Sequence, residues 1–114
     1  MKRSAVARLQ DMLAMIDAAA ELIEGSDFAA YRSDLKLRLA IERCIEIVSE
    51  ASRHVPAEPK ARFADIPWPE IAAIGNKLRH EYNRVDDVIL WRVASISLPS
   101  LRPVIAPILA DAGD

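Results

Sequence analysis

Apolar residues recur at alternating spacings of three and four along the first half of this chain, and this pattern constrains the fold most. In residues 4–24 the repeating positions are Val6, Leu9, Leu13, Ile16, Ala20 and Ile23. In a second segment, which ends near His54, they are Leu37, Ile41, Cys44, Val48 and Ala51. Such spacing places apolar side chains on one side of a helix, so both segments are predicted to be long amphipathic helices.

Capping residues set the predicted ends of these two helices. Ser4 is a suitable N-cap for the first helix, and Gly25 can adopt the left-handed conformation that ends it. Ser33 or Asp34 can cap the second helix. Two prolines follow the second helix and end it, so residues 55–67 are predicted to form a loop.

Two further helical segments are predicted in the second half of the chain. The third begins at residues 67–70, where a proline and a glutamate suit the first helical turn. Its predicted core stripe is Ile71, Ile74 and Leu78, with Tyr82 added if the helix extends that far. The fourth helix opens at Asp86, a good N-cap, and runs to about Leu98.

Prolines limit what can follow the fourth helix. Pro103 and Pro107 each lack an amide donor, so residues 99–110 are predicted to form at best a short or bent helix. Four main helices with short loops predict an all-α fold, an antiparallel bundle of four to five helices. The bundle is expected to be a single domain that covers residues 1–114.

Composition agrees with helices and narrows the class of protein. Aromatic residues make up 5% of the chain and only three glycines occur, which disfavours a sheet built from hairpins. The net charge of −2 gives no global attraction to nucleic acid, so RNA contact requires a local basic patch. Cys44 has no cysteine to pair with and is expected to be a buried thiol. No N-terminal signal or apolar run of membrane-spanning length is recognised, which predicts a soluble cytoplasmic protein without a membrane partner.

The polar stretch at residues 75–82 is the candidate functional segment. It holds His80, with Asn76 one helical turn before it, and its basic neighbours are Lys77, Arg79 and Arg84. One interpretation is a solvated helix face with an incidental histidine. The other is a site for phosphodiester cleavage, because a histidine can move protons beside cations that stabilise phosphoryl charge.

A row of carboxylates in the second helix raises the question of a metal site. Glu42, Glu46 and Glu50 are spaced by four and therefore share a helix face. The Glu-x-x-His sequence that accompanies such rows in di-metal bundles is missing. We therefore expect a solvated or interface-facing acidic row, paired with the arginines Arg38, Arg43 and Arg53, and we expect neither a metal nor a cofactor.

With these segments placed, the chain resembles the HepT family, minimal toxins of the HEPN superfamily. Residues 40–51 are similar to the second-helix signature of that family, and Ile66-Pro67-Trp68 is similar to its entry to the third helix. The remaining matches follow in order and spacing: His80-Glu81-Tyr82, Val85-Asp86, Trp91 and Leu98-Pro99.

The resemblance implies a HEPN bundle that forms a homodimer, with two active-site helices facing each other across a groove. Active members of the family are metal-independent ribonucleases with the motif R-x-x-x-x-H-x-Y, and the expected substrate is tRNA or mRNA. Their partner is the minimal nucleotidyltransferase antitoxin MntA, which silences the toxin by transferring AMP to the motif tyrosine. On this chain the motif histidine falls on His80 and the tyrosine on Tyr82.

This sequence departs from the motif at the arginine position, which is Gly75. The nearest arginine is Arg79, which points about 100° away from His80 on a helix. Arg84 shares the His80 face if the helix continues, and Arg43 of the second helix could also approach. Two hypotheses follow: a ribonuclease toxin, or a degenerate subunit that binds nucleotide or RNA.

The ribonuclease hypothesis gives each polar residue of the segment a role. His80 is the acid/base group, and Arg79 is the cation best placed by sequence. The predicted groove-lining residues are Asn76, Lys77, Arg84 and Arg43. Tyr82, the AMP acceptor, lies on the core face if the helix is unbroken, but it can reach the surface if the helix ends near Glu81.

Overall fold

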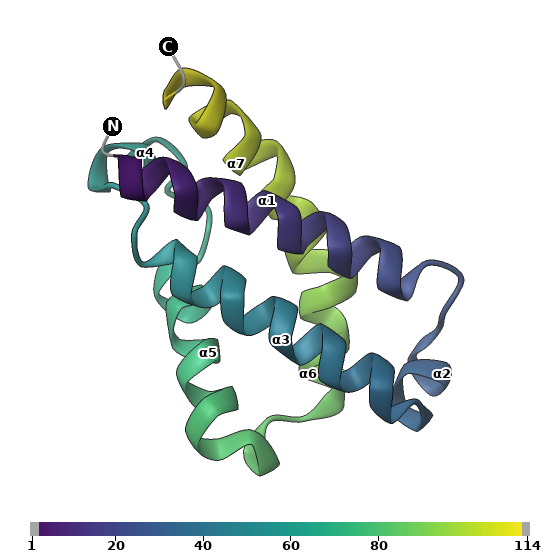
Figure 1. Cartoon of the computed structure of the whole chain (residues 1–114). Coiled ribbons are helices and arrows are strands. Elements are labelled where there is room, and N and C mark those ends of the chain that lie inside the picture. The colour runs from purple at the N-terminus through teal and green to yellow at the C-terminus, as the bar shows by residue number, and fades with distance from the viewer. Residues whose placement is uncertain (1–2, 113–114) are drawn as a thin grey trace.

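The prediction of an all-α antiparallel bundle is confirmed by a computed structural model that describes residues 3–112 (Figure 1). The helices of the first half are α1 (Arg3–Ile23), α2 (Phe28–Ser33), α3 (Leu35–Ser52) and α4 (Ala57–Arg62). The second half contains α5 (Trp68–Glu81), the 3₁₀ turn η1 (Tyr82–Arg84), α6 (Asp87–Arg92), the π-helical turn η2 (Val93–Ser97) and α7 (Leu98–Ala112). Within residues 3–112 there is no strand.

The core lies between α1, α3 and the α6–α7 segment, and α5 packs against the other side of α3 (Figure 1). The buried stripe predicted for α3 is confirmed at Ile41, Cys44, Val48 and Ala51. Burial raises the pKa of the Cys44 thiol, as expected for a thiol in an apolar environment.

The buried stripe of α1 differs from the predicted one. Its members are Ala5, Leu9, Met12, Ile16 and Ala19. Leu9 and Ile16 were predicted correctly, whereas Val6 and Leu13 are half-buried and Ala20 is exposed. The buried stripe is shifted by one residue at three positions, to Ala5, Met12 and Ala19, and this face of α1 packs against both α3 and α7.

Most predicted helix ends are confirmed. Gly25 has a φ of 75° directly after α1. Asp34, rather than Ser33, caps α3, since its Oδ1 accepts from the amide of Leu37 at 3.1 Å. Asp86 caps α6 in the same way. Two predictions were wrong: α1 already includes Arg3, so Ser4 is no cap, and the loop 55–67 contains the short helix α4.

The prediction for residues 99–110 was also wrong, because α7 is a regular helix that continues from α6 through η2. The prolines at positions 99, 103 and 107 are spaced by four and are all exposed, so the missing amide bonds fall on the solvent side. The π turn directly before Pro99 widens the helix where the proline ring would otherwise press on the preceding turn. The opposite face packs into the core through Leu98, Leu101, Ile105 and Ile108.

The joined helix Asp87–Ala112 spans 26 residues and is long and apolar enough to cross a membrane by length and composition. This corrects the expectation that no run has that length. Only 28% of its apolar 18-residue window is buried inside the structure, and the helix packs against α1.

Candidate functional site

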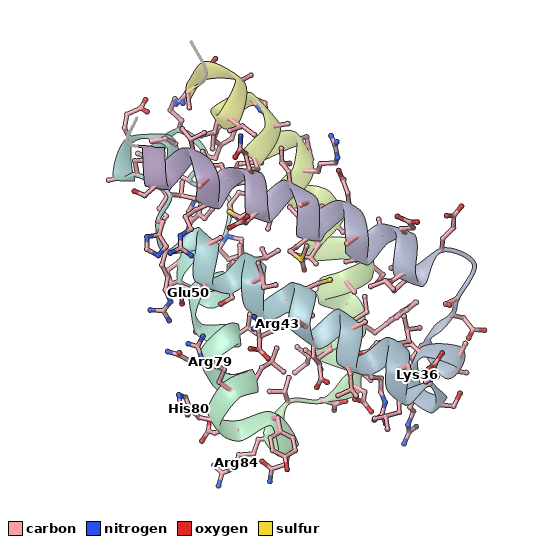
Figure 2. All side chains as sticks on the ribbon, in the orientation of Figure 1. Lys36, Arg43, Glu50, Arg79, His80 and Arg84 are labelled. Atoms are coloured by element: carbon pink, nitrogen blue, oxygen red, sulfur yellow. The ribbon has the colours of Figure 1, made fainter. Side chains whose placement is uncertain are left out.

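The candidate segment occupies the last turns of α5 and the 3₁₀ turn that follows. Leu78 points into the core, whereas Asn76, Lys77, Arg79 and His80 are exposed. Figure 2 shows Glu50, Arg79 and His80 along one edge of the molecule, with Arg84 at the end of α5 beyond them. The helix therefore displays its polar residues to solvent while its apolar residues hold it against α3.

Gly75, which stands at the position of the motif arginine, is buried against α3. Its amide nitrogen donates to Oγ of Ser49 at 3.0 Å, and the same hydroxyl donates to the carbonyl of Ala72 at 3.1 Å. A Cβ atom at position 75 would lie 2.6 Å from Ser49 Oγ and 2.8 Å from Ser49 Cβ. This helix crossing leaves no room for a side chain, so position 75 cannot present a guanidinium here.

Arg79 reaches back along α5 toward the turn where the motif arginine is expected. Its guanidinium donates a hydrogen bond to Oδ1 of Asn76 and lies 3.9 Å from Glu50 of α3. Helical side chains lean toward the N-terminus, so a residue one turn after Gly75 covers the turn that contains Gly75. Asn76 also lies on the face of α5 that carries His80, which follows it by one turn.

A carboxylate from α3 completes this neighbourhood. Glu50 lies 3.8 Å from Arg53, 3.8 Å from His54 and 3.9 Å from Arg79. From the sequence, His54 was named only as the end of the second helix, and Glu50 was not connected with Arg79. The spacing of four between Glu50 and His54 was the available signal, since it makes them helix neighbours.

The acidic row on α3 is paired much as predicted. Arg53 pairs with Glu50, and Arg43 pairs with Glu46 at 3.5 Å. Arg38 was expected to join them, but its ion pair is with Asp87 of α6 at 3.9 Å.

The predicted groove residues do not come together in one cavity. Lys77 and Arg84 line a cavity of about 630 Å³ between α3, α5 and the α6–α7 segment, whose walls are mostly apolar. Arg43 lines a different cavity of about 390 Å³ between α1 and α3, together with Arg79 and Glu50. Arg84 also pairs with Glu81 at 3.6 Å. Asn76, another predicted groove residue, accepts a hydrogen bond from Arg79.

The two tyrosines have opposite environments. Because α5 ends at Glu81, Tyr82 falls in η1 and its side chain is 70% exposed, which confirms the second of the two alternatives. Tyr31 is fully buried and its ring lies 5.4 Å from that of Trp91. Among residues 3–112 its hydroxyl finds no hydrogen-bond partner. Burial, followed by the charges of Glu42 and Asp87, raises the pKa of Tyr31 to about 12.

The chain is similar to a protein family and to individual proteins that are described as ribonucleases. The family model described as Ribonuclease HepT-like matches residues 12–108. A Thermococcus cleftensis protein named "Probable ribonuclease HepT" is 35% identical over 102 residues, which cover 90% of this chain and 93% of the relative. A Methanocaldococcus jannaschii protein named "Putative RNase" is 27% identical over 110 residues, covering 96% and 95%. No solved structure matches.

Proposed function

Since this chain belongs to the HepT-like ribonuclease family, we propose that it is a metal-independent endoribonuclease that acts as the toxin of a type VII toxin–antitoxin system. The observation that carries the proposal is the exposure of the neighbouring residues Arg79 and His80 at the end of α5, with Arg79 hydrogen-bonded to Asn76. The expected substrate is tRNA or mRNA, and the protein is expected to act in the cytoplasm.

The proposed reaction needs a proton acceptor, a proton donor and a cation. The ribose 2′-hydroxyl loses its proton to a base and attacks the adjacent phosphorus. The bond from phosphorus to the 5′-oxygen breaks, and an acid protonates that oxygen, leaving a 2′,3′-cyclic phosphate and a 5′-hydroxyl end. His80 suits the proton transfers because histidine titrates near neutral pH. Arg79 suits the developing phosphoryl charge because a guanidinium binds two oxygens at once.

The apolar cavity supports a homodimer. Ile89 and Ile96 stand beside it with exposed fractions of 50% and 62%. Two acidic residues line the cavity near the start of α5: Asp65 precedes the helix, and Glu70 lies in its first turn. Two basic residues line it nearer the other end: Lys77 lies in the second half of α5, and Arg84 lies in η1. A two-fold axis would bring the acidic end of one copy to the basic end of the other and place the two α5 helices side by side.

The partner is proposed to be an MntA-like nucleotidyltransferase that transfers AMP to Tyr82. The 70% exposure of this side chain supports the proposal, because its hydroxyl is accessible without unfolding the bundle. An adenylate at this position would stand two residues from His80 and would place a phosphate where the RNA backbone is expected.

Gly75 favours a second candidate function. Losing one preorganised donor can cost on the order of 10²–10³ in rate. If Arg79 does not compensate, the protein is a degenerate subunit that binds nucleotide or RNA and accepts AMP without cleaving.

The test is cleavage of labelled tRNA and mRNA by the purified dimer in the presence of a metal chelator, run beside His80→Ala. Cleavage by the unmodified protein alone is the expected result. Absence of cleavage by both proteins, in a preparation with unmodified Tyr82, would favour the degenerate subunit.

A further inference from the structure

Glu50 is surrounded by more positive charge than it can neutralise. Arg53, His54 and Arg79 lie 3.8 to 3.9 Å from its carboxylate, and each of the four side chains is between 41% and 43% exposed. In the part of the chain that the structure describes, these three cationic side chains have no other ion-pair partner. One carboxylate therefore serves two permanent cations and a third that appears when His54 is protonated, which leaves room for a second anion.

The cations around Glu50 retain donors for a ligand. Distances of 3.8 and 3.9 Å exceed the range of a hydrogen bond, so the N–H groups that face Glu50 are not satisfied by it. Arg53 is nevertheless fixed in place, because its Nη2 donates to the carbonyl of Ala72 on α5 at 2.8 Å. Arg79 is fixed through Asn76. A guanidinium that is held by one bond and has several free donors is preorganised for an oxyanion.

The position of this cluster relates it to the proposed cleavage site. Arg79 belongs to the cluster and is the chain neighbour of His80, and Glu50, Arg79 and His80 follow one another along a single edge in Figure 2. An RNA strand whose scissile phosphate lies at His80 and Arg79 would pass the end of α3 next.

We propose that Arg53 and His54, which lie beside Glu50 and near Arg79, form a subsite for an RNA backbone phosphate that neighbours the scissile one. The proposal rests on the function proposed above and extends it with a binding position on α3. In the free protein the Glu50 carboxylate attracts these cations, and the phosphate competes with it and replaces part of its interactions.

The test measures binding of an oligoribonucleotide whose 2′-hydroxyls are all methylated, so that no cleavage occurs. Arg53→Gln is expected to weaken binding roughly tenfold, the loss of one charge-assisted contact. The slope of log affinity against log salt concentration should also become shallower, by the amount expected for the loss of about one phosphate contact. Arg62→Gln is the matched control, since Arg62 is 46% exposed at the end of α4 and pairs with Glu58 at 3.1 Å and with Asp111 at 3.6 Å, outside the cluster around Glu50. Arg62→Gln should change neither the affinity nor the salt slope.

Glu50→Gln provides a test in the opposite direction. If Glu50 competes with the phosphate, its removal should tighten binding several-fold, whereas a purely structural role would weaken it. Circular dichroism on each variant keeps loss of folding apart from loss of binding. Equal salt slopes for Arg53→Gln and Arg62→Gln would overturn the subsite.

Parallel cleavage assays separate this proposal from the proposed function. On cleavable RNA, Arg53→Gln should raise KM and leave kcat unchanged. If Arg53→Gln cleaves RNA normally with an unaltered KM, the subsite is rejected and the ribonuclease function stands. If the unaltered protein binds RNA through Arg53 but does not cleave it, the ribonuclease function is rejected and the subsite stands. If AMP binds as tightly as the oligonucleotide with the same dependence on Arg53, the anion is a free nucleotide, and the proposal of an RNA phosphate fails.

Discussion

The amide of Gly75 donates a hydrogen bond of 3.0 Å to the hydroxyl of Ser49, which lies 26 residues earlier in the chain. This contact brings α5 so close to α3 that the glycine at the motif arginine position is a packing requirement. The missing arginine and the close helix crossing are therefore one structural feature, and the cation that remains is supplied from one turn later, by Arg79.

Gly75→Ala should destabilise the protein even though alanine is the better helix former. A Cβ atom would meet Ser49 Oγ at 2.6 Å, and such overpacking costs about 1–3 kcal/mol, more than the gain of about 1 kcal/mol in helix propensity. Urea unfolding measures the effect. In a Ser49→Gly background the clash is gone, so the same substitution should become neutral or stabilising. If Gly75→Ala leaves the free energy of unfolding unchanged when Ser49 is present, the two helices can move apart enough to accommodate the added Cβ atom.

Arg79→Lys should lower kcat on the order of 10²-fold, because lysine keeps the charge but loses the two-pronged donor that Arg79 presents beside Asn76. The comparison variant is Arg84→Lys. Arg84 pairs with Glu81 at 3.6 Å and lines the apolar cavity instead, so its replacement should change kcat little. Single-turnover cleavage distinguishes the two. Equal losses at both positions would show that general positive charge, and not Arg79, compensates for Gly75.

Local chemistry made much of this fold predictable. Asp34, Asp86 and Gly25 act within one turn of their own backbone, so the sequence alone indicates where those helices begin or end. The regular helix α7 was missed because its prolines are tolerated only when they all face solvent, which depends on the packing of the opposite side.

The candidate site was predictable in its residues but not in its arrangement. His80 was named from its residue type and its match to the motif histidine, and Arg79 as the nearest arginine, whereas the proximity of Arg79 to Glu50 of another helix was not predicted. Likewise, nothing near Gly75 in sequence indicates that Ser49 fills the space of its missing side chain. Contacts between distant segments decided these points, and a single sequence does not display them.

Ile96→Asp should weaken the proposed homodimer by at least roughly tenfold, because dimerisation would bury an unpaired carboxylate. Ile96 lines the apolar cavity and is 62% exposed in the single chain. Leu35→Asp is the control, since Leu35 is 58% exposed at the start of α3 and lies outside that cavity. Sedimentation velocity across a concentration series gives the dissociation constants. Dissociation caused by Leu35→Asp but not by Ile96→Asp would move the interface to the other end of α3.

Tyr82→Phe should abolish AMP transfer by the proposed partner and leave RNA cleavage nearly unchanged. The chain has two tyrosines, and Tyr31 is fully buried, so Tyr31→Phe should be modified like the unaltered protein. Intact mass measurement after incubation with the partner and ATP reads out the adduct. An adduct that persists in Tyr82→Phe would place the acceptor elsewhere.

Tyr31→Phe should protect the protein against alkaline unfolding. Burial first, and then the charges of Glu42 and Asp87, raise the pKa of Tyr31 to about 12 from an ordinary value of 10.0. Below pH 10 the phenol is neutral in both states, and its contribution to stability is fully present. As the pH rises from 10 toward 12, the unfolded chain loses this proton while the folded chain keeps it. Stability then falls by on the order of 1.4 kcal/mol per pH unit.

Phenylalanine removes this linkage, and it also removes a buried hydroxyl that has no hydrogen-bond partner. Tyr31→Phe should therefore equal or exceed the unaltered protein in stability at neutral pH, and its advantage should grow at about pH 11. Urea midpoints at both pH values measure the difference, with Tyr82→Phe as the control for loss of an exposed hydroxyl. If the unaltered protein and Tyr31→Phe lose stability in parallel at high pH, the buried phenol is not the group that titrates. Another group in the α2–α3–α6 junction, where Arg38 pairs with Asp87, would then have to account for the loss.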